Sequence, residues 1–367
     1  MKPYSLNKND KIAIISLSGG SLGEAYNKPI VELGIKRLKD LGFVTVFTPN
    51  SLKGIDFLHN NPKARAEDLK AAFRDDSIKA ILCAIGGDDT ILTIPYLLSD
   101  SEFILNVKKH PKVFFGYSDS TINHLMFCKL GLQTYYGISF ITDFCELAPN
   151  MIPYTLNSFV NFCNNPKAFS ITPSKYWYRE RDDYSIKNLG FERIAVEEER
   201  GYIFFNSMKK VKGELFGGCI EILSACLGII DKDWFYHKEI VDIFYKIADK
   251  FKLFPTKDYL KGKILFLESS EVFIKPEKLK QFLLKLEELG ILAVLNGIIV
   301  SKPMEEKYFD EYLSVYKDVC SKYSFPVIYN FNLGHSCPRN ILPYGVKCEI
   351  DPVNKTIRIV EKMTCDN

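Results

Sequence analysis

Residues 114–121, with the sequence FFGYSDST, contain the serine best placed for chemistry in this chain. An apolar strand enters, Gly116 permits a tight bend, and Ser118 precedes a predicted helix. A nucleophilic serine uses this geometry, because backbone N–H groups at a helix N-terminus can stabilise an oxyanion. The pattern departs from the G-x-S-x-G elbow of α/β hydrolases. Alternatively, Ser118 or Ser120 only caps the helix.

The loop 86–90, with the sequence GGDDT, is a second candidate, and it follows a buried type of strand. Its glycines free the backbone to approach a ligand closely. The loop resembles the Gly-Gly-Asp-Gly-Thr phosphate loop of NAD kinases and diacylglycerol kinases, but Asp89 adds negative charge where phosphate would lie. A nucleotide-binding kinase is therefore one hypothesis. The loop could instead donate hydrogen bonds to an oxyanion, or form an ordinary turn capped by Asp88 or Asp89.

A serine nucleophile needs a base, and histidine is scarce in this chain. His335 lies in the constrained loop GHSCP after a predicted strand and is the best-placed base. Glu268 ends an apolar strand and could orient that histidine, whereas Glu271 lies beyond the strand and is expected to be exposed. The other histidines are assigned to solvated loops (His59 and His110), helix packing (His124) and a structural role at a helix start (His237).

Strands and helices alternate in the first half of the chain and must position these residues. The alternation indicates parallel βαβ units in an open α/β sheet, where ligands bind at the carboxyl ends of strands. The 86–87 turn and Ser118 both follow such ends. The predicted strands are 11–16, 44–47, 79–85 and 113–115, and the predicted helices are 25–41, 64–74, 89–98 and 121–130.

Residues 172–211 are dense in charged and aromatic side chains and predict a long irregular or β-rich excursion. Loops this long are usually functional or disordered, and the aromatics favour an ordered binding surface over a solvated β-meander. The second half resumes the strand and helix signals. Its predicted helices are 217–228, 234–251, 276–289 and 305–323, its strands 263–267, 297–301 and 327–330, and its closing hairpin 346–350 with 356–360.

The composition is that of an ordinary globular protein, long enough for two domains. The 367 residues carry 48 Lys+Arg and 45 Asp+Glu, and the net charge of +3 gives no reason to expect nucleic acid or a membrane as partner. No stretch approaches the roughly 20 apolar residues of a membrane span. The ten cysteines form no Cys-x-x-Cys pair, so no metal is expected. A secretory pattern is absent, and we expect a cytoplasmic protein with reduced thiols.

Six segments in this order resemble the LD-carboxypeptidase family of serine peptidases, which includes muropeptide LD-carboxypeptidases and microcin C self-immunity peptidases. They are IGGDDT, FFGYSDST, LFGGCIEIL, ILFLESSE, GIIVSKP and GHSCPRNILPYG, and the resemblance covers nearly the whole chain. It implies an N-terminal open parallel-sheet α/β domain, a smaller β-rich α/β domain at the C-terminus, and an active site between them. It also implies a homodimer and no cofactor.

The resemblance further implies a Ser-His-Glu triad. Ser118 would be the nucleophile, His335 the base, and Glu268 the acid that fixes the base. The other implied site residues are Gly87 and Asp119, whose backbone N–H groups would form the oxyanion hole, and Gly86 and Asp88, which would contact the substrate.

We expect residues 1–168 to form the domain with the nucleophile, 169–212 the excursion, and 213–367 the domain with the acid and the base. The segment 229–262 is longer than the family pattern and looks like an insertion that covers the cleft or extends a dimer face. The excursion resembles an extra loop of the microcin-immunity branch, in which an aromatic stacks on the substrate nucleobase. Trp177 is the best match, with Tyr176 and Tyr178 as competitors.

The sequence therefore predicts a serine carboxypeptidase or amidase that cleaves an amide near the carboxyl end of a small peptide-like substrate. A microcin C-type peptidyl or aminoacyl nucleotide is favoured. The alternative substrate is a muropeptide tail with a terminal D-residue.

Overall fold

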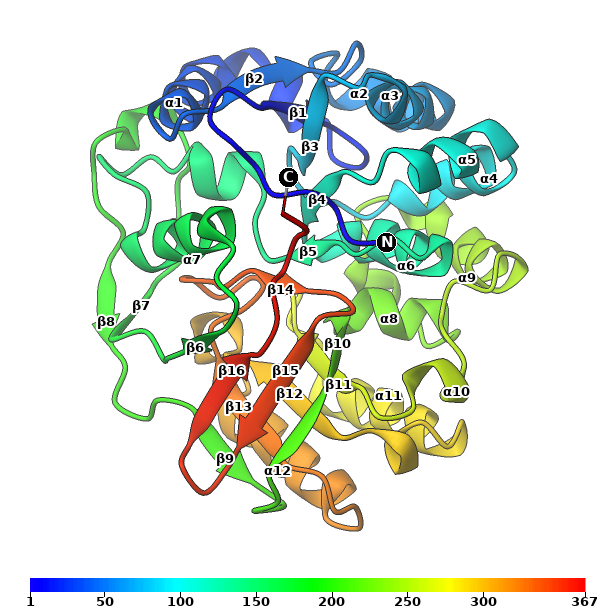
Figure 1. The fold of residues 1–367 in the computed structure, drawn as a ribbon, viewed down its shortest axis with the longest axis vertical. Coiled ribbons are helices and arrows are strands. Elements are labelled where there is room, and N and C mark those ends of the chain that lie inside the picture. The colour runs from blue at the N-terminus through cyan, green and yellow to red at the C-terminus, as the bar shows by residue number, and fades with distance from the viewer. Residues whose placement is uncertain (367) are drawn as a thin grey trace.

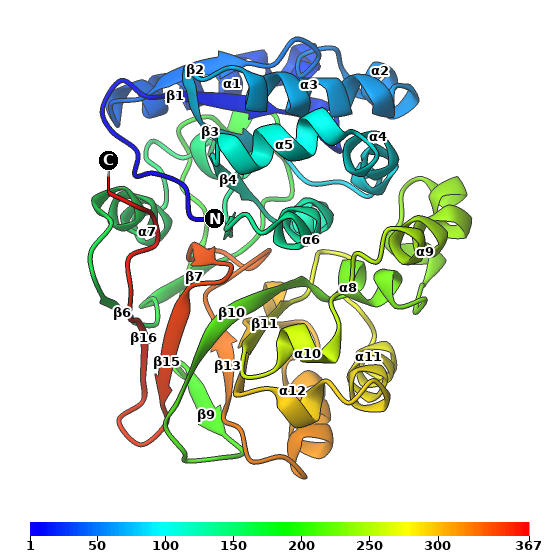
Figure 2. The same ribbon diagram turned by 45° about the vertical axis from the view of Figure 1, so that its right-hand side comes forward.

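The computed structural model describes residues 1–366 and places them in two α/β halves, one above the other in Figures 1 and 2. The N-terminal half contains a six-stranded sheet in the order β14-β5-β4-β3-β1-β2. Strands β1 to β5 pair in parallel, as the alternation of strands and helices predicts. Their bounds are Lys11–Ile15 for β1, Val44–Phe47 for β2, Ile78–Cys83 for β3, Val113–Gly116 for β4 and Tyr135–Tyr136 for β5.

The helices of this half connect and flank the strands. The helix predicted over 89–98 is divided, with a 3-10 turn at Thr90–Thr93 before α4. Pro95 explains the division, because proline lacks an N–H group and is tolerated only in the first turn of a helix. The helices are α1 (Lys28–Asp40), α2 (Ile55–Asn60), α3 (Pro62–Arg74), α4 (Ile94–Leu98), α5 (Ser101–Lys109), α6 (Thr121–Leu130) and α7 (Pro153–Asn164).

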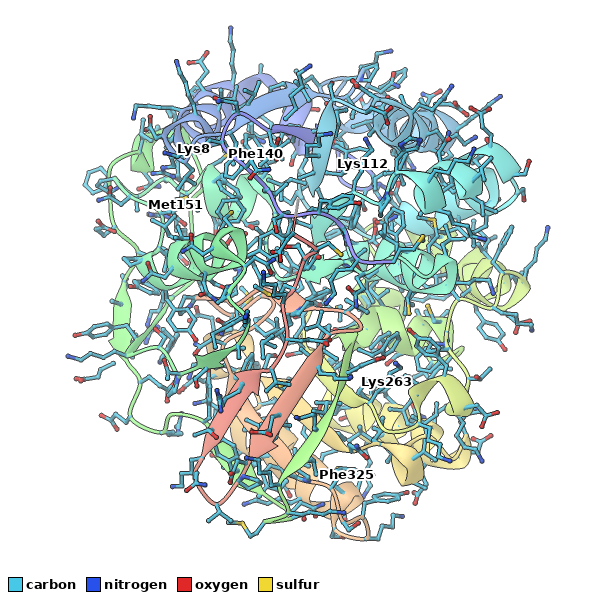
Figure 3. The ribbon with its side chains drawn as sticks, in the orientation of Figure 1. Lys8, Lys112, Phe140, Met151, Lys263 and Phe325 are labelled. Carbon is cyan, nitrogen blue, oxygen red and sulfur yellow. The ribbon has the colours of Figure 1, made fainter. Side chains whose placement is uncertain are left out.

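Phe140, labelled in Figure 3, lies in the buried core beneath α1. Gly34 of α1 makes this packing possible, because an added Cβ there would lie 2.7 Å from the Phe140 ring. The ring also contacts Phe47 of β2 edge-on, with centroids 6.3 Å apart. Helix and sheet therefore approach closely where the core is aromatic.

The C-terminal half contains an eight-stranded sheet in the order β6-β16-β15-β10-β11-β12-β13-β9. Strands β10 to β13 are parallel, and antiparallel strands flank them, including the predicted hairpin of β15 and β16. The bounds are β6 Phe169–Ile171, β9 Ile203–Phe205, β10 Val211–Cys219, β11 Ile264–Glu268, β12 Gly297–Ser301, β13 Val327–Phe331, β15 Lys347–Asp351 and β16 Thr356–Ile359.

The start predicted for the helix at 217 is wrong, because Gly217 belongs to β10. An added Cβ at Gly217 would lie 1.7 Å from the carbonyl oxygen of Phe266, so the glycine permits close strand packing rather than helix initiation. The helices of this half are α8 (Ile220–Cys226), α9 (Val241–Lys250), α10 (Lys257–Leu260), α11 (Pro276–Glu288) and α12 (Phe309–Cys320).

The two halves are interlocked. The short strand β14 (Leu342–Pro343), from the C-terminal half, pairs with β5 and extends the N-terminal sheet. Aromatic rings pack across the junction, with the centroid of Phe266 5.4 Å from Tyr136 and 5.2 Å from Tyr344. Figure 1 shows both termini near this junction, where the N–H of Cys365 donates to the carbonyl of Pro3.

The excursion is β-rich, as predicted. Strands β7 (Tyr176–Tyr178) and β8 (Ala195–Glu197) form a two-stranded ribbon, while β6 and β9 join the edges of the C-terminal sheet. The divisions after 168 and 212 are kept as a proposal, and residue 367 lies outside the described part of the chain. All ten cysteines are free thiols. Within residues 1–366, no helix is long and apolar enough to cross a membrane.

Candidate active site

Ser118 lies on a sharp turn between β4 and α6. Its φ of +63° is in the left-handed region, which is uncommon for a residue other than glycine and costs conformational energy. The turn presents the half-buried hydroxyl toward the end of β3, where Gly86 follows. An added Cβ at Gly86 would lie 2.9 Å from the hydroxyl oxygen of Ser118 and 3.6 Å from the backbone nitrogen of Asp119. The glycine therefore leaves the space beside Ser118 open.

The loop after β1 holds the glycine turn in place. The N–H of Gly19 donates to the carbonyl of Gly86, and an added Cβ at Gly87 would lie 2.4 Å from the hydroxyl of Ser18. That hydroxyl donates to the buried carboxylate of Asp119 at 2.5 Å. Burial raises the pKa of Asp119 to about 7. Gly86, Gly87 and Asp119 thus meet around the serine, and Ser18 is a contact that sequence motifs do not reveal.

His335 and Glu268 complete a hydrogen-bonded chain from the serine. Nε2 of His335 lies 3.0 Å from the hydroxyl oxygen of Ser118, and Nδ1 lies 2.7 Å from Oε2 of Glu268. Glu268 is fully buried at the carboxyl end of β11, and His335 follows β13. Gly334 permits this approach, since an added Cβ there would lie 2.3 Å from Oε2 of Glu268. The three residues predicted from scattered motifs are therefore in contact.

Tyr136, at the end of β5, contacts both Ser118 and Glu268, the two ends of this series of hydrogen bonds. Its hydroxyl accepts a hydrogen bond from the backbone N–H of Ser118 at 3.1 Å and donates one to Oε1 of Glu268. Burial, together with the Glu268 charge, raises the pKa of Tyr136, so the phenol keeps its proton. Nothing in the local sequence YYG distinguishes this tyrosine from Tyr135.

Glu271 is exposed, as expected, but its carboxylate turns back to the site. Oε2 lies 3.1 Å from Nε2 of His335, the nitrogen that also faces Ser118. Burial disfavours the imidazolium, but Glu268 and Glu271 outweigh it and raise the pKa of His335 to about 10. Burial likewise opposes ionisation of Glu271, yet His335 lowers the pKa of this carboxyl to about 2. In the free protein the pair is ionised at neutral pH.

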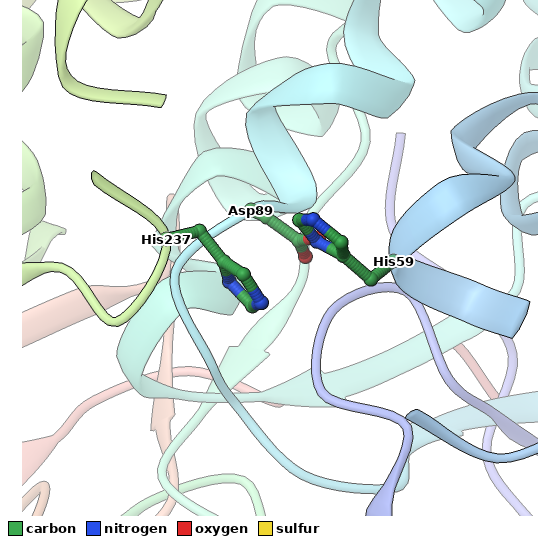
Figure 4. A group of neighbouring side chains, drawn as sticks. All are labelled: His59, Asp89 and His237. Carbon is green, nitrogen blue, oxygen red and sulfur yellow. The ribbon is translucent and has the colours of Figure 1, made fainter. Parts of the chain in front are cut away.

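Figure 4 shows a second group of side chains, His59, Asp89 and His237, which line the same cleft as Ser118 and His335. The imidazoles of His59 and His237 stack with centroids 3.8 Å apart, and Nδ1 of His59 lies 3.1 Å from Asp89. The expectation that His59 is solvated is therefore wrong, since its side chain is 25 % exposed. Arg65, which is fully buried, donates to the other oxygen of Asp89 at 2.5 Å.

This group includes the ligand types of a metal site, because each residue offers one ligand atom within 4.8 Å of the others. Zinc bonds of about 2.0 Å bring ligands to roughly 3.3 Å from one another, so the stacked rings would have to turn. As it stands, the group joins the two halves. Asp88 strengthens the junction, because its carboxylate accepts from the backbone N–H of His237 at 2.8 Å and contacts Nδ1 at 2.7 Å. Segment 229–262 is thereby fixed to the glycine loop.

A cleft of about 720 Å³ contains Ser118 and His335, and it is lined by both halves, the excursion and segment 229–262. Tyr184 and Arg193 line it from the excursion, and Tyr236 lines it from segment 229–262. The structure does not bring Trp177 to this cleft. Its indole is 6 % exposed on β7, with Nζ of Lys302 4.9 Å from the ring.

The fold thus brings a serine of one half into contact with a histidine of the other. Comparison with known proteins gives the family. Residues 12–137 match the LD-carboxypeptidase N-terminal domain, and residues 212–350 match the LD-carboxypeptidase C-terminal domain. The chain belongs to the LD-carboxypeptidase family, peptidase family S66, as its six segments predicted. The peptidase hypothesis is confirmed at this level, and the kinase alternative finds no support.

Relatives of both predicted branches are found. An MccF-like protein from Streptococcus pneumoniae, solved in complex with AMP, is 42 % identical, covers 95 % of this chain and 98 % of its own, and superposes with a TM-score of 0.87. The microcin C7 self-immunity protein MccF of Escherichia coli is 26 % identical over 96 % of this chain and 94 % of its own. A Bacillus subtilis protein named "Probable murein peptide carboxypeptidase" is 24 % identical over 97 % of this chain and 93 % of its own.

Proposed function

We propose that this protein is a serine carboxypeptidase that uses Ser118, His335 and Glu268 as a catalytic triad to hydrolyse an amide near the carboxyl end of an aminoacyl or peptidyl nucleotide. The observation that carries the proposal is the continuous chain of hydrogen bonds, with 3.0 Å between Ser118 and His335 and 2.7 Å between His335 and Glu268. Both distances suit proton transfer and orientation of the imidazole.

In the acylation step, the hydroxyl oxygen of Ser118 attacks the scissile carbonyl carbon while Nε2 of His335 takes the hydroxyl proton. The backbone N–H groups of Gly87 and Asp119 donate to the developing oxyanion, each contributing about 3–4 kcal/mol to the transition state. The C–N bond then breaks as His335 returns the proton to the leaving nitrogen. Glu268 holds Nδ1 protonated throughout and stabilises the imidazolium.

In the deacylation step, His335 takes a proton from water, which attacks the ester formed on Ser118. The ester bond breaks and the proton returns to the serine oxygen, so that the free acid leaves and the site is restored.

Two observations favour a nucleotide as the leaving group over the terminal D-residue of a muropeptide. Tyr184 is 50 % exposed and lines the cleft from the excursion, so its ring can pack against a base. The relative from Streptococcus pneumoniae binds AMP. We therefore propose that the excursion binds the nucleoside, with Tyr184 in the role that the sequence assigned to Trp177, and that Gly86 contacts the substrate carbonyl.

The test is to incubate the full chain with glutamyl sulfamoyl adenosine and, separately, with a tetrapeptide muropeptide, and to separate the products by liquid chromatography. We expect release of glutamate and the sulfamoyl nucleoside, with a fall of about 10⁴- to 10⁶-fold in the Ser118→Ala and His335→Ala variants. Cleavage of the muropeptide alone would overturn the nucleotide proposal, and unchanged turnover in either variant would overturn the triad.

A homodimer and a cytoplasmic location are proposed on the family resemblance. Sedimentation velocity of the purified chain tests the first, and fractionation of cells tests the second.

A further inference from the structure

Glu271 is a charged side chain that lines the cleft and contacts His335, yet the proposed triad gives it no role. Its carboxylate and the hydroxyl of Ser118 both lie within hydrogen-bonding distance of one atom, Nε2 of His335. It follows β11 by three residues and is 41 % exposed, so it faces the cleft rather than the core. It therefore stands beside the place where the substituents of a scissile carbonyl must lie.

The partners of Glu271 include no permanent cation. Besides His335, its carboxylate accepts a hydrogen bond from the hydroxyl of Tyr236 at 3.2 Å, and no lysine or arginine of the described chain forms an ion pair with it. Other carboxylates of the cleft are matched by arginines, except Asp88, which contacts the backbone N–H and the imidazole of His237. Arg193 and Arg181 pair with Glu146, and Arg65 pairs with Asp89. The charge of Glu271 is thus balanced only by the imidazolium.

The charge pair between Glu271 and the imidazolium conflicts with the proposed role of His335 as a base. A protonated imidazole cannot take the proton of Ser118, and the pair with Glu271 keeps the imidazole protonated. When His335 is neutral, Glu271 retains its charge in a partly buried position with only uncharged donors, the Tyr236 hydroxyl and its own backbone N–H, which is unfavourable. A cation supplied by the substrate would restore the balance.

We propose that Glu271 is the binding site for the α-ammonium group of an aminoacyl substrate, and that this ammonium replaces the imidazolium as its partner and frees His335 to act as a base. The α-ammonium is bonded to the carbon next to the scissile carbonyl, so it enters the site beside Ser118 together with that carbonyl. This inference rests on the proposed function and narrows the substrate to aminoacyl compounds with a free amine.

The groups around His335 make Glu271 the one to change. Glu268, on β11, faces Nδ1. Tyr117, in the N-terminal half, packs edge-on against the imidazole, with the ring centroids 5.1 Å apart. On the His335 loop itself, Arg339 lies 3.5 Å from the backbone carbonyl of His335 and Cys337 is a buried thiol. Of these, only Glu271 contacts Nε2 without being part of the proposed triad.

The experiment compares glutamyl sulfamoyl adenosine with its N-acetyl counterpart, in the wild type and in Glu271→Gln. We expect the wild type to prefer the free amine by a factor on the order of 10- to 100-fold in kcat/KM, the range of one hydrogen bond to a charged group. The variant should lose that preference. With the N-acetyl substrate, the acid limb of its pH profile should move to lower pH, because His335 loses one of its two carboxylate partners.

Glu239→Gln is the matched control, since this carboxylate contacts His59 at 3.2 Å rather than His335. It should leave both the preference and the acid limb unchanged. Equal turnover of the two substrates by the wild type, or a preference retained in Glu271→Gln, would overturn the proposal.

Calorimetry on Ser118→Ala gives a readout that does not depend on turnover. The free-amine ligand should bind about 10-fold or more tightly than the N-acetyl ligand, and adding Glu271→Gln should abolish the difference. Equal binding of the two ligands would overturn the ammonium site. Turnover that survives Ser118→Ala would instead overturn the triad, so the two failures are distinguishable.

Discussion

The hydroxyl of Tyr136 lies between the backbone N–H of Ser118, from which it accepts, and the carboxylate of Glu268, to which it donates. Tyr136 is in the N-terminal sheet, whereas Glu268 is in the C-terminal sheet. One phenol therefore links the turn that carries the proposed nucleophile to the acid that holds the proposed base. We interpret Tyr136 as a positioning residue, because it touches none of the atoms that react.

Tyr136→Phe should lower kcat by about 10- to 100-fold with little change in KM, because the hydroxyl orients groups that already lie in place. Kinetics with a saturating aminoacyl nucleotide and a melting curve check this expectation. Tyr135→Phe is the matched control, since its hydroxyl is equally buried but donates to the carbonyl of Met363 at 2.8 Å. Equal kcat losses in the two variants would show that burial rather than positioning is responsible.

Gly86→Ala should abolish most activity while the fold persists. The added methyl would lie 2.8 Å from Cβ of Ser118 and 2.9 Å from its hydroxyl oxygen, so the nucleophile must move. We expect a fall in kcat/KM of at least about 100-fold, since small misplacements of reacting groups are this costly. Gly297→Ala controls for the general effect of the substitution, because its φ is not left-handed and its Cβ would approach only the end of a side chain, Cδ1 of Ile350 at 3.2 Å, as its nearest neighbour. That variant should keep full activity.

Tyr184→Ala should raise KM for an aminoacyl nucleotide by about 10-fold, because stacking on a base is worth roughly 1–3 kcal/mol. Trp177→Ala should instead lower the melting temperature, since a buried indole is removed. Steady-state kinetics and thermal melts on both variants separate these effects. If Trp177→Ala raised KM at unchanged stability, the assignment of Tyr184 would be incorrect.

Asp88→Asn should loosen segment 229–262, because the carboxylate holds both the backbone N–H and the imidazole of His237. Limited proteolysis should cut between 229 and 262 several times faster than in the wild type, and KM should rise because Tyr236 lines the cleft. His110→Ala, which removes an exposed ion pair with Asp76, should change neither quantity. Unchanged proteolysis in Asp88→Asn would mean that other contacts hold the segment.

The ion pair of His335 and Glu271 makes stability depend on pH. In the unfolded chain, a histidine titrates near pH 6.5 and a glutamate near pH 4.3. The pKa of His335 is raised to about 10, so its contribution is complete below about pH 6.5 and is lost as the pH rises toward 10. The pKa of Glu271 is lowered to about 2, so its contribution is complete above about pH 4.3 and is lost as the pH falls toward 2.

The loss of melting temperature in Glu271→Gln should therefore be largest between about pH 5 and pH 6 and should shrink by pH 9.5. Calorimetric melts of the wild type and the variant at these values measure it. Glu288→Gln should show no such dependence on pH, because this carboxylate pairs with Lys285, which keeps its charge over this range. A constant difference across the range would mean that the two side chains do not interact in solution.

The sequence predicts the main parts of the site because each is a short segment with its own signal. Ser118 and His335 each follow an apolar strand, and Glu268 ends one. Parallel strands of one sheet end at the same edge, which brings Glu268 and His335 together, whereas Ser118 comes from the other sheet. The order of these three residues along the chain is the one that the family resemblance implies. The parallel sheets and the closing hairpin were also predictable, because each strand is a short segment with its own sequence signal.

Contacts between distant segments were not predictable. Ser18 meets Asp119, and Glu271 meets His335, only because the loops after separate strands converge. The choice between Trp177 and Tyr184 depends on the β7–β8 pairing, which turns the indole toward Lys302. In an isolated sequence both are aromatics in one charged segment.

The crossing of β14 from the C-terminal half into the N-terminal sheet has a consequence for how this enzyme folds. The loop that carries His335 leads directly into β14, and β14 completes the edge of the sheet that bears Ser118. A fragment that ends before residue 335 would contain the proposed nucleophile without the proposed base and would leave β5 as an open edge. Recovery of hydrolysis during refolding should therefore report the docking of the two halves, and no nascent chain should be active before residue 343 has emerged from the ribosome.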